Sequence, residues 1–228
     1  MKALIFIILL AGSCFGQLAG NPDNWCREGF FTRDSKAFNL GLVKTGKGGH
    51  AYFYGDESEK CPNDASCKRK GYLVGGDQIV INRVRGNFAC AWFGPSKGSP
   101  TVGWLRLADI DRPAMLLDAS ETAWTGEWKY GDNSISISPH KLGGYVNIFG
   151  EAVWKGVGDN VHVGELNGRF EHKNGLLNYS DGDNEADCRA RLNLLGGFLI
   201  VSDNMKCGGL NVSFSGIYVK RNAEARTK

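Results

Sequence analysis

Histidine, cysteine and carboxylate side chains carry most protein catalysis and metal binding, so we consider these residues first. The His-Glu-x-x-His motif of zinc peptidases is absent, and His140, His162 and His172 lack the spacing of metal ligands. The acidic run from Asp181 to Asp187 lacks the glycine and the final glutamate that a calcium loop requires, so it is predicted to be an exposed loop. We therefore expect a protein without catalytic residues, metal site or cofactor.

The cysteines are better explained as disulfide partners than as nucleophiles or zinc ligands. Cys14 lies in an N-terminal leader, which leaves an even set of six. No histidine follows Cys188, and there is no Cys-x-x-Cys pair to suggest structural zinc. Sequence position favours three bridges, namely Cys26 with Cys90, Cys61 with Cys67, and Cys188 with Cys207.

The first residues have the layout of a secretory signal peptide. Lys2 precedes an apolar run from Ala3 to Ala11, and small residues follow at Gly12, Ser13 and Gly16. The run is too short to span a bilayer. Cleavage could follow Gly16 or Gly20, and lipid attachment at Cys14 is a less favoured alternative. We expect a secreted or periplasmic protein without a transmembrane segment.

Composition excludes a dedicated nucleic-acid binder. The chain has 27 basic and 24 acidic residues, so removing Lys2 with the leader leaves a formal charge of 26 − 24 = +2. A nucleic-acid binder needs a clustered basic face. A small net charge is compatible with a polymer of mixed or mildly negative charge, such as peptidoglycan. The basic run Lys68-Arg69-Lys70 could attract an acidic partner.

Short alternating segments and 32 glycines indicate an all-β chain. Ser134 to Ser138 alternates strictly, and Val146 to Trp154 places apolar residues on one strand face. Gly196-Gly197 predicts a hairpin turn that brings Cys188 near Cys207. The last strand is predicted from Asn211 to about Tyr218.

Breaks in this pattern divide the chain. We assign residues 1–20 to the signal peptide, 21–112 to a first domain with an N-terminal extension, and 113–123 to a linker that could contain one helical turn. Residues 124–221 form a second barrel or sandwich that opens at Trp124, and 222–228 a flexible tail.

Residues 50–110 resemble bacterial SH3-like domains. The matching features, in order, are Ala51 to Tyr54, Lys70 to Asp77, Gly86-Asn87-Phe88, Gly103-Trp104-Leu105 and Asp109-Ile110. The Cys61 to Cys67 insertion in the first loop departs from the family. The resemblance implies a small barrel that recognises peptides or cell-wall fragments without catalysis.

Aromatic residues within this segment are the predicted ligand-binding side chains. They are Tyr52, Tyr54, Trp92 and Trp104, whose rings could stack on sugar or proline-like surfaces or else fill the core. Tyr52 and Tyr54 share strand parity and are predicted to lie on one face, whereas Phe53 and Phe88 are assigned to the core.

The second domain is similar to β-domains at the end of many exported bacterial proteins, on the basis of Trp124 to Trp128, Cys207-Gly208-Gly209 and Phe214 to Tyr218. No activity is implied by that similarity. Three functions follow as hypotheses. The favoured one is an exported, non-catalytic protein that binds cell-wall peptide, glycan or a protein partner. The alternatives are an inhibitor or immunity protein against a lysozyme- or amidase-type enzyme, and a hydrolase that uses scattered carboxylates.

Overall fold

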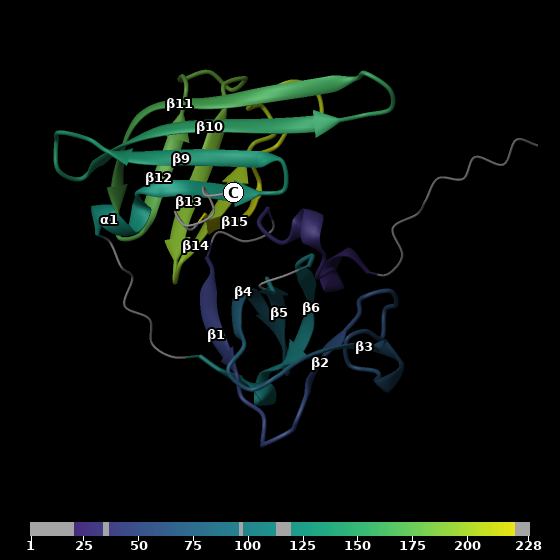
Figure 1. The fold of residues 1–228 in the computed structure, drawn as a ribbon. Coiled ribbons are helices and arrows are strands. Elements are labelled where there is room, and N and C mark those ends of the chain that lie inside the picture. The colour runs from purple at the N-terminus through teal and green to yellow at the C-terminus, as the bar shows by residue number, and fades with distance from the viewer. Residues whose placement is uncertain (1–20, 34–36, 96–97, 113–119, 222–228) are drawn as a thin grey trace, which may run out of the picture.

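The computed structural model describes residues 21–33, 37–95, 98–112 and 120–221. The predicted signal peptide (1–20), the predicted tail (222–228) and residues 113–119 of the predicted linker lie outside these ranges. The described chain is all-β and contains two antiparallel sheets, with the N-terminal segment between them (Figure 1). In these residues, no helix combines the length and apolar character required to cross a bilayer.

The N-terminal sheet has seven strands in the order β3-β2-β6-β5-β4-β1-β7. Its ladder stays open between the edge strands β3 and β7, so the sheet forms a half-barrel. The sheet begins with β1, which precedes residues 50–110, the segment that resembles SH3-like domains. Its strands are β1 (Asn39–Val43), β2 (Ala51–Tyr54), β3 (Lys68–Leu73), β4 (Gln78–Arg85), β5 (Phe88–Phe93), β6 (Thr101–Arg106) and β7 (Ile110–Asp111).

The C-terminal barrel closes through eight strands in the order β10-β11-β12-β13-β14-β15-β8-β9. Its strands are β8 (Gly126–Tyr130), β9 (Asn133–Pro139), β10 (Tyr145–Lys155), β11 (Val161–Lys173), β12 (Leu176–Ser180), β13 (Arg189–Leu195), β14 (Phe198–Asp203) and β15 (Gly216–Lys220).

Helical structure in the described residues is limited to single turns. The α-helix α1 (Glu121–Trp124) is capped by Ser120 and places Trp124 in the barrel core, fully buried. The 3₁₀ turns are η1 (Pro22–Asn24), η2 (Glu28–Phe30), η3 (Ala65–Cys67) and η4 (Leu107–Asp109).

The barrel strands follow the alternation of the sequence. In β9, Ile135 and Ile137 are buried while Ser134 and Ser136 are partly exposed, and Val146 and Ile148 are buried in the same alternating way along β10. Strand side chains point to opposite faces in turn, so this alternation buries one face of each strand in the barrel. The strands predicted here are confirmed.

The predicted hairpin at Gly196-Gly197 is also confirmed, and it contacts the other sheet. Both glycines have positive φ, 55° and 89°, as a two-residue hairpin turn requires. A Cβ at Gly196 would come within 2.1 Å of Leu40 Cδ1. Glycine is therefore needed at this position both for the turn and for the close approach of β1.

Three hydrophobic clusters hold the protein together. One fills the barrel and one lies on one face of the N-terminal sheet. The third is shared, because Leu195, Ile200 and Ile217 of the barrel belong to the same cluster as Val80 and Trp92 of the sheet. The two sheets thus bury apolar surface against each other.

All three predicted disulfides are present. Cys26 bonds to Cys90, Cys61 to Cys67, and Cys188 to Cys207. The last bridge closes the base of the β13–β14 hairpin, where Ala190 pairs with Asp203. In the chain-entropy view, each bridge stabilises the fold mainly by restricting the unfolded chain.

The prediction of a last strand from Asn211 is wrong at its N-terminal half. Val212 and Phe214 are buried as predicted, but the ladder begins only at Gly216. The preceding backbone binds the Asp203 carboxylate, which accepts bonds from the Phe214 amide (2.7 Å) and from the hydroxyls of Ser213 and Ser215. The Asp203 carboxylate thus accepts hydrogen bonds from a segment that has no partner strand. The alternation of apolar and polar residues does not predict this contact.

We predict that Asp203→Ala lowers the free energy of unfolding by about 3 kcal/mol, because four donors, the Met205 amide among them, lose a charged acceptor. Urea titration followed by tryptophan fluorescence measures the change. Asp159→Ala, at an exposed position in the β10–β11 turn, should change the free energy by less than about 0.5 kcal/mol. Equal effects of the two substitutions would contradict this role for Asp203.

Candidate functional site

The fold separates the four aromatic residues predicted to bind ligand. Tyr54 and Trp104 are 6% and 0% exposed, so they pack in the core and do not present a surface to a ligand. Trp92, 4% exposed, lies at the junction with the barrel, where its ring packs edge-on against Phe198. Of the four, only Tyr52 lies on a partly exposed part of the sheet.

The N-terminal segment explains why Tyr54 and Trp104 are buried. Residues 21–33, which we call the strap, lie over one face of the N-terminal sheet (Figure 1). The Trp104 indole nitrogen donates to the Asn24 carbonyl at 2.7 Å, and the Asn82 amide donates to the Phe31 carbonyl at 2.9 Å. The Arg83 guanidinium donates to the carbonyl of Trp25. Sheet side chains therefore satisfy strap carbonyls that have no strand partner.

A buried carboxylate and a disulfide hold the middle of the strap. Asp56 is 1% exposed, and its Oδ2 accepts a bond from the Cys26 amide at 2.8 Å and another from Arg27 Nε at 2.9 Å. Cys26 is also bonded to Cys90 of β5. Burial of a carboxylate is costly unless donors such as these compensate for its lost hydration, so the strap and Asp56 depend on each other.

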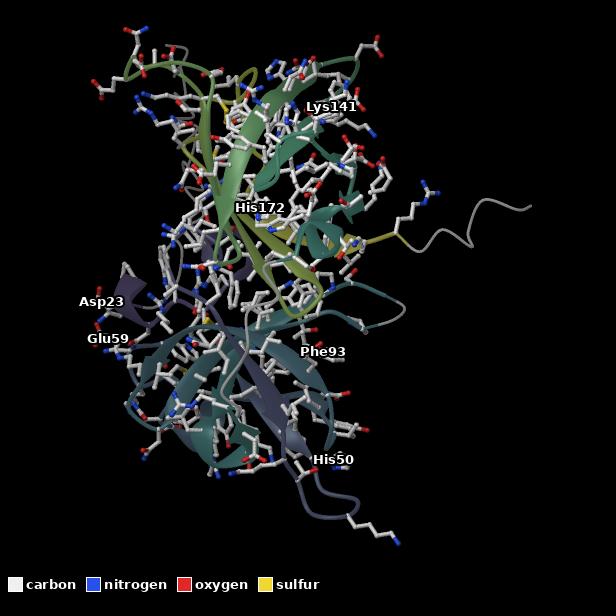
Figure 2. The ribbon with its side chains drawn as sticks, turned by 90° about the vertical axis from the view of Figure 1, so that its left-hand side faces the viewer. Asp23, His50, Glu59, Phe93, Lys141 and His172 are labelled. Carbon is white, nitrogen blue, oxygen red and sulfur yellow. A yellow bond between two sulfur atoms is a disulfide. The ribbon has the colours of Figure 1, made fainter. Side chains whose placement is uncertain are left out.

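Tyr52 and Tyr54 both pack on the hydrophobic cluster beneath the strap, as their shared strand parity predicts. Tyr54 is a buried member of that cluster, whereas Tyr52 packs against it and stays partly exposed. Tyr52 lies opposite Tyr72 of β3, with ring centres 5.7 Å apart. His50 packs on Tyr72 at 3.9 Å. Tyr72 is 49% exposed, so this cluster presents aromatic surface to solvent. Figure 2 shows His50 at the end of the sheet far from the barrel.

Two lysines adjoin these rings in the same edge strand. Lys68 Nζ lies 3.6 Å from the centre of the Tyr52 ring, and Lys70 is exposed between Lys68 and Tyr72. Neither lysine forms an ion pair with any residue that the structure describes. We call His50, Tyr52, Lys68, Lys70 and Tyr72 the candidate face.

Arg69, between the two lysines, is already occupied. Its guanidinium bonds to Glu57 at 2.5 Å. Burial raises the pKa of Glu57, but the hydrogen bonds and charge of Arg69, together with backbone bonds, outweigh it and leave that pKa below its ordinary value. Glu57 therefore remains a charged partner for Arg69 at neutral pH. Of the basic run predicted to attract an acidic partner, the two lysines are available.

A glycine-rich loop borders the candidate face. Residues 45–50, with Val74 and Gly75, line a depression of about 310 Å³ that reaches His50. Gly48 has φ of 75°, and an added Cβ there would meet no atom within 4 Å. The depression lies next to the rings and extends the surface that a bound molecule could contact.

The other residues with potential chemistry have structural contacts. His140 Nδ1 accepts the Leu142 amide at 3.1 Å, the His162 ring bonds to the Leu210 carbonyl, and His172 packs against Trp124. The Asp187 carboxylate closes its own loop by accepting the Asn184 amide at 2.6 Å. Among the described residues, no group of three histidine, cysteine or acidic side chains is suited to hold a metal ion.

One sequence match needs its structural context. Gly94 to Gly98 spells Gly-x-Ser-x-Gly, the pattern of a serine nucleophile elbow. An elbow joins a strand to a helix, whereas these residues connect strands β5 and β6. Residues 96–97 lie outside the described ranges, and we assign no nucleophile here.

Tyr72 and His50 are the members of the candidate face that sequence reasoning missed. The sequence did contain a signal for Tyr72. The loop that follows Tyr54 leads into the predicted strand that contains Tyr72. The pairing of Tyr72 with Tyr52 depends on an irregular strand register between Tyr52 and Tyr54. That register could not be predicted from the sequence of the loop.

Comparison with known proteins adds no relative from which function could be transferred. No protein-family model matches the chain, and neither a curated protein nor a solved structure matches it. The SH3-like resemblance of residues 50–110 therefore stays a prediction.

We predict that Asp56→Ala releases the strap and costs about 3–5 kcal/mol of unfolding free energy, because Arg27 and the Cys26 amide lose a buried charged acceptor. Asp56→Asn keeps one oxygen acceptor and should cost less. Hydrogen exchange at the Cys26 amide measures the release directly. Asp23→Ala, at an exposed strap carboxylate, is the matched control. Unchanged Cys26 exchange in Asp56→Ala would contradict the proposed clamp.

Proposed function

We propose that this protein is an exported, non-catalytic binding protein that recognises cell-wall peptide or glycan at the candidate face. The main support is the half-exposed Tyr72 ring, packed with His50 and Tyr52 beside two lysines without an ion pair in the described chain. This face combines apolar ring surface and cationic donors, with a phenol hydroxyl at the edge.

The chemistry of this face suits a glycan that carries peptide carboxylates. An aromatic ring can pack on the C–H face of a sugar or on an aliphatic side chain while its hydroxyl stays in water. Lys68 and Lys70 can form charge-assisted hydrogen bonds with carboxylates. Peptidoglycan offers both kinds of group along one polymer, and repetition of the motif would strengthen attachment through multivalency.

The disulfides support export. Three bridges within one chain are typical of proteins that fold in an oxidising compartment. The predicted leader would deliver the chain there, and the cell wall lies in such a compartment. The proposed location of the protein is therefore consistent with the proposed cell-wall ligand.

We predict that Tyr72→Ala reduces retention on purified peptidoglycan about tenfold, because loss of the exposed ring removes roughly 1.4 kcal/mol of packing. Co-sedimentation with insoluble peptidoglycan measures the apparent affinity. Tyr145→Ala, on the barrel, is a matched tyrosine control and should bind normally. Undiminished retention of Tyr72→Ala would reject the candidate face.

The same assay separates the contribution of charge. Lys68→Gln with Lys70→Gln should weaken binding several-fold and reduce its dependence on salt, because exposed charges are screened as ionic strength rises. Lys173→Gln, on the barrel, should have no effect. A salt dependence that persists unchanged in the double variant would place the electrostatic contact elsewhere.

A second candidate function, inhibition of a wall-degrading enzyme, is favoured by an apolar patch on the β10–β11 hairpin. Val157 at the turn is 98% exposed, and Val161, Val163 and Leu210 nearby are 51%, 66% and 74% exposed. Grouped exposed apolar side chains mark protein contact surfaces. The hairpin is also the longest in the described chain, so its tip could enter the cleft of another protein.

If this second function is correct, the protein inhibits a lysozyme- or amidase-type enzyme, and Val157→Asp with Val163→Asp lowers that inhibition at least tenfold. Two desolvated charges at a contact cost more than the 1.4 kcal/mol that this factor requires. Enzyme assays on peptidoglycan with increasing protein give the inhibition constant. Leu142→Asp, at another exposed position of the barrel, is the control. Absence of inhibition by the unmodified protein would exclude this function.

A further inference from the structure

A crevice lies where the strap, the N-terminal sheet and the barrel meet. It has a volume of about 240 Å³ and is lined by residues from three parts of the chain. Its lining includes Trp92 and Ile217, which are buried, and Tyr130 and Trp154, which are partly buried. The volume is below the range of about 300–1,000 Å³ for drug-sized ligands, so the crevice suits a smaller molecule.

Charges of both signs lie at the mouth of the crevice. Glu28 and Arg33 are exposed and belong to the strap. The Tyr130 hydroxyl donates to Glu28 Oε1 at 3.3 Å. Burial and the negative charge of Glu28 raise the pKa of Tyr130, whereas the positive charge of Arg33 acts in the opposite direction. Both charges therefore act on one phenol, which stays protonated and keeps donating to Glu28.

The polar groups of the crevice differ in their availability. The hydroxyls of Ser213 and Ser215 bond to the Asp203 carboxylate and serve the structure of the wall. Arg33 forms no ion pair with any described residue, and only one oxygen of Glu28 receives the Tyr130 bond. The guanidinium of Arg33 and the second oxygen of Glu28 are thus available to a ligand.

We propose that this crevice binds a zwitterionic ligand of one amino-acid residue, as a free amino acid. Arg33 would hold the α-carboxylate, for which a guanidinium offers two parallel donors. Glu28 would accept from the α-ammonium, and an apolar side chain would lie against Trp154 and Ile217. The proposal is independent of the candidate face, which lies at the far end of the N-terminal sheet.

Isothermal titration with leucine, in both L and D forms, tests the proposal on the full mature chain. We expect saturable one-to-one binding of at least one form. Leucinamide, which lacks the carboxylate, and N-acetylleucine, which lacks the ammonium, should each bind at least tenfold more weakly. N-acetylglucosamine, a neutral sugar, should not bind. Absence of binding by leucine and the other free amino acids, or preference for the sugar, would overturn the proposal.

Two conservative variants test which ligand group each charged side chain binds. Arg33→Gln should lose the preference for leucine over leucinamide, and Glu28→Gln should lose the preference for leucine over N-acetylleucine. Lys155→Gln, at an exposed cation near the end of β10, should keep both preferences. Circular dichroism verifies that each variant is folded. If both variants retain both preferences, Glu28 and Arg33 do not form the site. Because Tyr72→Ala leaves the crevice intact, it should bind leucine normally even if it loses peptidoglycan, so the two proposals can fail separately.

Discussion

The Asp56 carboxylate, buried beneath the strap, is the interaction that holds in place the segment contacting both sheets. It anchors the Cys26 amide and Arg27, and the Cys26–Cys90 bridge secures the same point covalently. From there the strap runs to the barrel, where Ser202 donates to the Thr32 carbonyl. One short segment thus covers Trp104, contacts both sheets and supplies the charged mouth of the crevice. A change at Asp56 would therefore affect features of both sheets.

The shared cluster gives this arrangement an apolar basis. The β13–β14 turn packs on Leu40, and Trp92 lies between the sheet and Phe198 of the barrel. Two domains joined only by a linker would move independently, whereas buried apolar contact favours one relative position. The crevice can keep a defined shape for this reason. The candidate face does not depend on this contact, because it lies at the opposite end of the sheet.

Features encoded locally could be predicted from the sequence. Alternation located β9 and β10, the glycine pair located the β13–β14 hairpin, and spacing gave the three disulfides. Features that depend on distant contacts could not. The predicted Cys26–Cys90 bridge ties residues 21–33 to β5, where Cys90 pairs with Trp104. The bridge alone does not show that the segment covers the rings of Tyr54 and Trp104, so these rings suggested a ligand face. The irregular segment before Gly216 was missed for the same reason, since its partner is the Asp203 side chain.

The polar side chains beneath the strap show why residue type alone is a weak guide to function. Arg83, Asn82 and Trp104 could be read as a row of ligand donors, yet each donates to a strap carbonyl. These bonds are needed because an extended segment without a strand partner leaves buried carbonyls that must find donors. Donors used in this way are not available to a ligand. Binding chemistry is therefore best sought where polar groups keep donors or acceptors that the described fold does not use. Lys68 and Lys70 of the candidate face meet that condition, as do Arg33 and Glu28 of the crevice. The two proposed sites lie there for this reason and not on the covered face of the sheet.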